Sequence, residues 1–317
     1  MLAFVIRRVA AAAAMLLVIG TIIFSLLLIV PGDPAELLLS TGGGSATPEA
    51  IANVRAEMGL DQPVLEQYGT FLYNTVRFDF GRSIVDKGAI SDAIALRLPR
   101  TLELIIVGAI LALGLAIPAG TIAGLKAGGR FDITASGLNA LITSVPGFVI
   151  GTLFIYFFAQ QLGWLPAGGY VAFASNPGQH LQMLILPALT VGLHLGTIIF
   201  RMTRASVLEM RGHDWVRTAA AKGLRRSLVV RRHVLKNALG PIITVVGLQL
   251  GILLGSTVLV EFVYNWPGIS GLLVSAVEQR DYPTVRAIIL TVAAIFIGIN
   301  LVIDILSSLI DPRIRLQ

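Results

Sequence analysis

The 317-residue sequence contains no cysteine and has few charged residues. The absence of cysteine excludes a disulfide framework and any thiolate metal site. Charged residues make up 13% of the chain, against about 25% in typical soluble domains. Hydrophobic residues make up 55%, and the mean hydropathy is +0.82. These values predict an integral membrane protein, in which the net charge of +6 sets orientation and does not bind nucleic acid.

Other motifs that the sequence lacks limit the reactions that this chain could catalyse. There is no G-x-x-x-x-G-K-[ST] loop to hold ATP phosphates. The tetrad "GISG" at 268–271 resembles the serine motif of rhomboid proteases, but no histidine follows Ser270 to act as its base. The four histidines are scattered and do not indicate a metal route. We therefore expect no catalytic residue, no metal and no cofactor in this chain, and hence no enzyme.

Six apolar runs have the length of about 20 residues that a transmembrane helix needs. They are Val9–Val30, Thr101–Leu125, Ser136–Ala159, Leu181–Phe200, Pro241–Val260 and Ala287–Leu306. The first run exceeds the roughly 7–15 residues of a signal-peptide core, so we interpret it as a retained helix; a cleaved signal is the alternative. The sequence thus predicts an all-α protein with six membrane spans.

The charges orient these spans. With both termini in the cytoplasm, the cytoplasmic segments hold 16 Arg and Lys against 4 Asp and Glu. The opposite side then holds 8 basic and 12 acidic residues. Because basic residues accumulate in cytoplasmic loops, we expect both termini in the cytoplasm and residues 31–97 outside.

Small residues recur at four-residue spacing within the spans, which lets helix backbones approach closely. The pairs and triplet are Gly120/Gly124, Gly147/Gly151, Gly192/Gly196 and Gly247/Gly251/Gly255. Pro118, Pro146 and Pro187 predict kinks. Together these patterns predict a tightly packed helical bundle.

A basic segment at 212–241, "GHDWVRTAAAKGLRRSLVVRRHVLKNALGP", interrupts the apolar sequence with seven Arg and Lys residues. Locally it predicts two short helices separated by Gly223 in a left-handed conformation. Asp214 is expected to cap the first helix and Ser227 the second. The alternative is a loop that only sets topology or touches anionic lipid.

The basic segment resembles the cytoplasmic signature loop of type I ABC importer permeases. "DWVRTAAAKGL" and "RHVLKNAL" carry the resemblance. Ala219 and Gly223 match the small residue and glycine of that loop. Arg217 and Thr218 replace its acid and first alanine, and Lys236 replaces its proline. These departures are similar to the peptide-transport branch of the family.

Four further motifs resemble the first permease subunit of dipeptide, oligopeptide and nickel importers. They are "PGDPAE" at 31–36, "MGLDQPVLEQYGTFLYNTVRFDFGRSI" at 58–84, "VEFVYNWPGISGLL" at 260–273 and "LIDPRIR" at 309–315. The resemblance implies a first helix with an extracytoplasmic segment in 1–94 and a five-helix transmembrane domain in 95–310. A coupling loop would occupy 203–240 and a cytoplasmic tail 311–317.

The resemblance also implies partners. In this family a short coupling helix docks into a groove on a cytoplasmic ATPase. The matching residues here are Asp214, Trp215, Val216, Ala219, Ala220, Lys222 and Gly223. A second homologous permease, two ATPases that bind ATP and Mg, and an extracytoplasmic binding protein complete the importer that the resemblance implies, in a bacterial inner membrane.

The outer segment predicts two helices beside the membrane. Thr47 and Pro48 start the first, which ends at Gly59, and Pro63 starts the second. The second helix carries an apolar stripe of Val64, Tyr68, Phe71, Leu72 and Val76. The acidic residues expected to contact the binding protein are Glu57, Asp61 and Glu66. A structural cap with no partner contact is the alternative.

Polar residues in the spans are candidates for the translocation path: His194, Gln249 and Glu261. A hydrogen bond within the bundle is the alternative for His194. An ion- or proton-coupled secondary transporter is the alternative function, with Glu103, Glu261 and Asp304 as proton carriers. All three lie near span ends, which favours capping or ion pairing instead.

Overall fold

The computed structural model describes residues 2–29, 35–36, 47–57 and 59–310, and this part of the chain is helical with no strand. An isolated bridge joins Arg82 and Ala89. Most of the "PGDPAE" motif and the predicted tail at 311–317 lie outside the described residues. In chain order the helices are α1 (Leu2–Ile29), α3 (Pro48–Glu57), α4 (Val64–Val76), α5 (Ile90–Leu125), α6 (Arg130–Ser144), α7 (Gly147–Phe154), η1 (Ile155–Gln161), α8 (Pro177–Arg211), α9 (Asp214–Ala221), α10 (Arg226–Val229), η2 (Val230–Leu235), α11 (Lys236–Ser256), α12 (Val258–Val263), α13 (Ile269–Glu278) and α14 (Tyr282–Ile310).

Five of these helical segments are long and apolar enough to cross a membrane, and the number is six if one bent pair counts as a span. The bent pair is α6 followed by α7 and η1, which meet at 101°. The break falls at Val145 and Pro146, both extended, because a proline disfavours the helical region for the residue before it. The predicted kink at Pro146 is therefore a full break, whereas Pro118 and Pro187 lie inside continuous helices.

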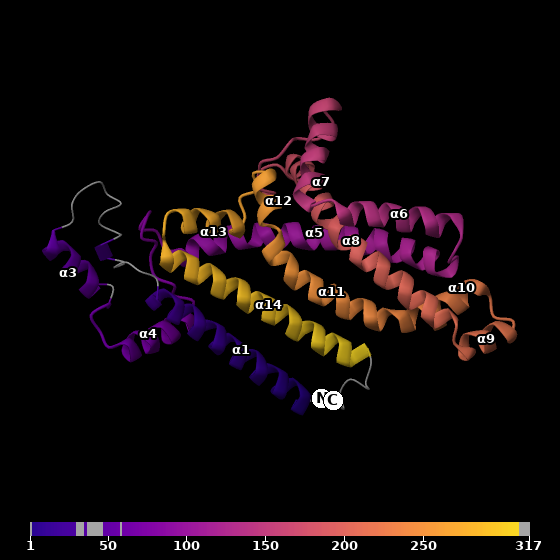
Figure 1. Ribbon diagram of the computed structural model, residues 1–317, viewed down its shortest axis with the longest axis horizontal. Coiled ribbons are helices and arrows are strands. Elements are labelled where there is room, and N and C mark those ends of the chain that lie inside the picture. Colours follow the sequence, from indigo (N-terminus) through magenta and orange to yellow (C-terminus); the bar gives the residue numbers. More distant parts are fainter. Residues whose placement is uncertain (1, 30–34, 37–46, 58, 311–317) are drawn as a thin grey trace. The chain divides into compact units, whose positions relative to one another are not determined.

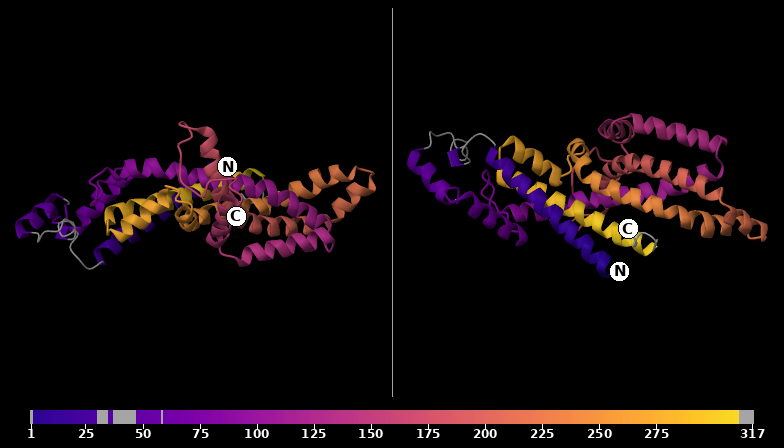
Figure 2. Two further views of the ribbon diagram at one scale, coloured as in Figure 1. Left: turned by 90° about the horizontal axis from the view of Figure 1, so that it is seen from above. Right: turned by 60° about the horizontal axis from the view of Figure 1, so that its bottom comes forward.

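The chain divides into two compact units. The first comprises Met1–Val9, Pro99–Gly271 and Ile295–Gln317. Within it, α8 packs against α6, α7 and α11 (Figures 1 and 2). At its amino-terminal end Asn176 caps α8 by accepting a hydrogen bond from the Gln179 N–H at 3.1 Å. At its other end α8 leads directly into α9, so this helix connects the membrane bundle to the basic segment.

Glycines bring α5 and α8 into backbone contact. A Cβ on Gly120 would lie 2.8 Å from the Phe200 carbonyl oxygen, and one on Gly124 would lie 2.8 Å from that of Arg204. Farther along the same seam, a Cβ on Gly192 would lie 2.7 Å from the carbonyl oxygen of Gly108. Real Cβ atoms do not approach this closely, so only glycine fits these three positions. The predicted close packing is confirmed for Gly120, Gly124 and Gly192.

The other predicted glycine pairs behave differently from one another. Gly247 and Gly251 of α11 lie directly against Ile303 and Phe296 of α14. Gly255 and Gly147, by contrast, have no atom within 4 Å of an added Cβ. Spacing alone therefore does not identify which face of a helix is packed.

The second unit comprises Ala10–Leu98 and Leu272–Ala294. Phe24 of α1 stacks on Phe71 of α4 with 5.5 Å between ring centroids, and Leu290 of α14 joins this cluster. The buried Asp281 accepts hydrogen bonds from the Ser83 hydroxyl at 2.6 Å and the Thr284 hydroxyl at 2.7 Å. It thereby starts α14 and fixes the loop that follows α4 in place.

The local predictions for the outer segment are mostly confirmed. Thr47 caps α3 through the Ala50 N–H, and Gly59 after α3 has a φ of +67°. Pro63 immediately precedes α4. The predicted apolar stripe is only partly correct, because Phe71 is buried whereas Val64 and Val76 are 53% and 79% exposed. The centre of α4 packs on α1, and its two ends do not.

Candidate coupling surface and supporting sites

The helix expected to couple to an ATPase is α9, eight residues long and attached to the end of α8. His213 occupies the N-cap position, with extended backbone, and Asp214 is the first helical residue. The prediction that Asp214 caps the helix is therefore wrong. Its side chain is instead 94% exposed in the first turn of the helix. The helix dipole stabilises negative charge at this position. Gly223 follows α9 with a φ of +75°, as predicted.

The segment after Gly223 differs from the prediction of a second short helix. Arg225 is the N-cap of α10, so Ser227 is a helical residue and not a cap. Residues Arg226–Ser256 form one span-length segment through α10, η2 and α11. The π-helical η2 accommodates an extra residue without ending the helix. What the sequence presented as a separate helix is therefore the first part of a membrane span.

One face of α9 is buried in this chain's own core. Val216 and Ala219 are 9% and 6% exposed and pack with Val207 of α8 and with Val234 and Ala238 of the following helix. The hypothesis that Ala219 offers its small surface to a partner's groove is therefore wrong. Its side chain must be small because α9 lies close against α8 and α11.

The rest of α9 and the residues that follow it are exposed. Trp215 is 39% exposed, and Ala220, Lys222 and Gly223 are exposed. The Trp215 ring stacks on His213 with 5.5 Å between centroids and an angle of 16° between the planes. No atom lies within 4 Å of the position of a Cβ on Gly223, so space there is open. Of the seven coupling candidates, five are therefore accessible and two anchor the helix.

Charged groups that the sequence analysis missed hold the loop between α5 and α6 against the end of α8. Arg204 donates hydrogen bonds from Nε and from Nη2 to the buried carboxylate of Asp132. The bond from Nη2 to Oδ2 is 2.8 Å long. Asp132 also accepts the Gly128 N–H at 2.9 Å. Arg211 donates to the carbonyl oxygens of Gly124 at 3.0 Å and Leu125 at 2.8 Å. These hydrogen bonds therefore join the end of α8, immediately before α9, to the end of α5 and the start of α6.

Glu261 is buried, with both carboxylate oxygens satisfied by protein donors. Oε1 accepts the Thr101 hydroxyl at 2.6 Å, and Oε2 accepts the Ser270 N–H at 3.0 Å. The Thr101 hydroxyl oxygen in turn accepts the Ile269 N–H at 2.9 Å. This geometry joins α5, α12 and the start of α13. A role in the translocation path stays a prediction for Glu261; its contacts are those of a structural anchor.

The other path candidates have fewer contacts. His194 is half-buried in α8, and its Nδ1 is buried with no hydrogen-bond partner among the described residues. The alternative of a bundle-facing hydrogen bond therefore receives no support at that atom. Gln249 is half-buried in α11. Both stay predictions for the path.

Two acids in the spans, Glu103 and Asp304, contact basic side chains. Glu103 Oε1 lies 2.7 Å from His180 Nε2, and Asp304 lies 2.9 Å from Arg8. The interpretation of these acids as pairing groups is confirmed. No group of three or more potential metal ligands occurs among the described residues.

The acidic residues expected to meet a binding protein lie around the turn between α3 and α4. Asp61 is exposed and accepts a hydrogen bond from Arg55 Nε at 3.1 Å. Glu66 is exposed in the first turn of α4. Glu57 is the last residue of α3, and its side chain lies outside the described part. These three positions therefore flank one turn, with Asp61 already engaged within the chain.

Comparisons with known proteins agree with this architecture. Residues 116–316 match the family "Binding-protein-dependent transport system inner membrane component", and residues 1–105 match the corresponding amino-terminal family. A protein named as a peptide transport system permease in Brucella abortus (strain 2308) is 39% identical over 319 residues, covering 99% of each chain. The glutathione transport system permease protein GsiC of Escherichia coli (strain K12) is 39% identical over 315 residues, also covering 99% of each.

Solved structures show the same fold. An inward-facing form of the MetNI methionine ABC transporter matches with a TM-score of 0.59 and 15% identity, covering 69% of this chain and 96% of that one. A second crystal form of the same transporter matches with a TM-score of 0.55. ATP hydrolysis in such transporters takes place in separate subunits, so this chain is not an enzyme, and the secondary-transporter alternative does not hold. The chain belongs to the family of binding-protein-dependent transport system inner membrane components and is the multi-pass permease subunit of an ABC importer.

Proposed function

We propose that this permease forms, with a second homologous permease, the path by which short peptides or related small solutes enter a bacterial cell. Two ATPase subunits, which bind ATP and Mg, drive the transport, and an extracytoplasmic binding protein delivers the cargo. The names of the relatives, peptide and glutathione permeases at 39% identity over nearly the whole chain, support this class of cargo. Both termini and the basic segment face the cytoplasm, as the distribution of Arg and Lys indicates.

The exposed face of α9 carries the coupling proposal. Trp215, Ala220 and Lys222 are exposed around the part of the helix that is not packed, while Val216 and Ala219 fix the helix to the core of its own chain. A helix anchored on one side and open on the other transmits a displacement without detaching. ATP-driven movement of the ATPases would therefore shift the ends of α8 and α11 and reorient the bundle.

Two experiments test this function. Since the chain has no cysteine, Ala220→Cys introduces a unique thiol for crosslinking to the copurified ATPase. We expect a crosslink there, and none from a cysteine at Ala219, which is buried. Mass spectrometry of the ligand that the cognate binding protein carries then identifies the cargo. A ligand unrelated to peptides would contradict the cargo proposal, and absence of the Ala220 crosslink would contradict docking through the exposed part of α9.

A further inference from the structure

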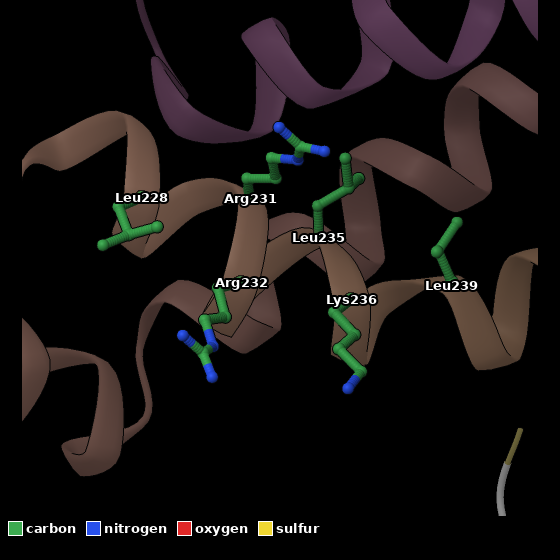
Figure 3. A pocket seen from close by; sticks show the side chains of 6 residues that line it. All are labelled: Leu228, Arg231, Arg232, Leu235, Lys236 and Leu239. Atoms are coloured by element: carbon green, nitrogen blue, oxygen red, sulfur yellow. The ribbon is translucent and has the colours of Figure 1, made fainter.

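The helix that follows α9 carries a groove of mixed character, which we call the basic groove. It is lined by Leu228, Arg231, Arg232, Leu235, Lys236 and Leu239 (Figure 3). These residues come from α10, η2 and the first turn of α11. The other side of the same helix contributes Val229, Val234 and Ala238 to the core. The groove is therefore the outward face of a helix that is firmly packed on its inner face.

The charge of the basic groove is uncompensated. Arg231, Arg232 and Lys236 are exposed, and the side chain of none of them has an ion pair or hydrogen bond to another described residue. The sequence contains no Asp or Glu anywhere in 215–260. Figure 3 shows Arg232 and Lys236 extending to one flank of the helix and Arg231 to the other. Three cations with no local anion favour a ligand that carries negative charge.

The leucines indicate what kind of anion. Leu228 is 42% exposed, and Leu235 and Leu239 are half-buried along the same helix. The segment Arg226–Ser256 is long and apolar enough to span a membrane, and its later residues Leu248 and Ile252 are 52% and 49% exposed. The first turns of a span lie at the level of the lipid headgroups. An acidic protein surface would match the cations but not a row of leucines that continues into an apolar span.

We propose that the basic groove binds an anionic phospholipid, with Arg232 and Lys236 beside its headgroup on one flank of the helix, Arg231 on the other flank, and Leu235 and Leu239 along its first acyl carbons. Clusters of Lys and Arg beside a span bind anionic headgroups, and each cation strengthens the attraction about fivefold. The site lies next to the coupling surface on α9 but uses none of its exposed residues. It requires only that the chain spans a membrane and not that the proposed cargo is correct.

The test uses the full chain with its copurified partner subunits in nanodiscs. A bimane label on Leu239→Cys, a half-buried position that lines the groove, reports on lipid bound there. The lipid probes are brominated phosphatidylglycerol and brominated phosphatidylcholine. We expect phosphatidylglycerol to quench the label at a concentration at least about tenfold lower, because three cations act together. Raising the salt concentration should reduce this preference in the unaltered protein, since charge attraction is screened.

Matched variants distinguish lipid binding in the groove from a general effect of positive charge on the protein surface. The triple variant Arg231→Gln, Arg232→Gln, Lys236→Gln should lose the preference. The control triple Arg130→Gln, Arg217→Gln, Arg225→Gln removes the same charge at exposed positions outside the groove and should keep it. Arg231→Lys with Arg232→Lys should also keep it, which shows that the helix tolerates substitution.

Four results would overturn the proposal. Equal quenching by the two lipids in the unaltered protein, or a preference that salt does not change, would show that no anionic lipid occupies the groove. Equal loss in both triple variants would show a diffuse charge effect. Loss of the copurified ATPase in the groove variant, with lipid preference unchanged, would assign the groove to an acidic protein partner instead.

Discussion

His180 lies between two hydrogen-bond acceptors. Its Nδ1 is 2.7 Å from the Val171 carbonyl oxygen, and its Nε2 is 2.7 Å from Glu103 Oε1. A carbonyl oxygen accepts hydrogen bonds and does not donate them, so Nδ1 carries a hydrogen. The Nε2–Glu103 contact then needs one further hydrogen, held by either the ring or the carboxyl group. His180 is only 1% exposed, so this pair holds the loop before α8 by two bonds inside the protein.

This arrangement predicts different effects for two substitutions of Glu103. Glu103→Gln should keep the loop in place, because the amide NH₂ can donate to Nε2 of a neutral ring. Glu103→Leu should leave Nε2 without a partner, at a cost of about 1–3 kcal/mol. Hydrogen–deuterium exchange of residues 163–176 measures the difference. Equal protection in both variants would show that the pair does not hold the loop.

The two faces of α9 predict different failures. Ala219→Trp should lower the thermal stability of the permease, because overpacking of this core costs about 1–3 kcal/mol. Ala220→Trp should leave stability unchanged but reduce the amount of copurified ATPase and the transport rate. Gly223→Val adds about 1 kcal/mol of strain at positive φ. Arg217→Gln, at an exposed charge, is the matched control and should have little effect. Normal ATPase binding by Ala220→Trp would contradict docking through this face.

The seam between α5 and α8 predicts a sharp contrast between two glycines of α5. Gly124→Leu would place side-chain atoms against the backbone of Arg204 and against Val207, so we expect destabilisation of at least about 1–3 kcal/mol. Gly114→Leu meets no atom within 4 Å of its Cβ and should be tolerated. Thermal unfolding in detergent compares the two. Similar unfolding temperatures would show that the seam is less tight than the structure indicates.

The outer acids predict a graded response. Glu66→Lys should weaken stimulation of the ATPase by the binding protein without altering assembly, because Glu66 is exposed in the first turn of α4. Asp61→Lys should have two effects, since it also breaks the contact with Arg55. Exposed pairs contribute only about 0–1 kcal/mol, so this second effect should be small. Unchanged stimulation in both variants would favour a structural cap.

Orientation is testable with two exposed serines. Ser175→Cys, in the loop before α8, should react with an impermeant thiol reagent in intact cells, or in spheroplasts where an outer membrane intervenes. Ser227→Cys, in α10, should react only after the membrane is opened. The chain has no cysteine of its own, so each variant reports a single site. The reverse pattern would contradict cytoplasmic termini.

The sequence predicted five of the six spans as continuous helices, and the turn at Gly223, because these follow from local rules. Apolar length identifies a span, and only glycine readily adopts positive φ. It did not predict that Ala219 faces its own core, because burial depends on where α8 and α11 lie. The Arg204–Asp132 pair was missed for the same reason, since no local pattern links residues on two separate helices. Likewise, Pro146 indicated a kink, but its size of 101° depends on how the flanking helices pack.

The second short helix expected after Gly223 is not separate from the span that was expected to begin at Pro241, and this continuity has a mechanical consequence. The segment after Gly223 runs through η2 into α11 as one span-length helix, and α8 ends immediately before α9. A force applied at Trp215 is therefore transmitted to two membrane spans, one that precedes α9 in the chain and one that follows it. Gly223 is then the hinge of this linkage, since the left-handed backbone at that residue separates α9 from the rigid helix that follows.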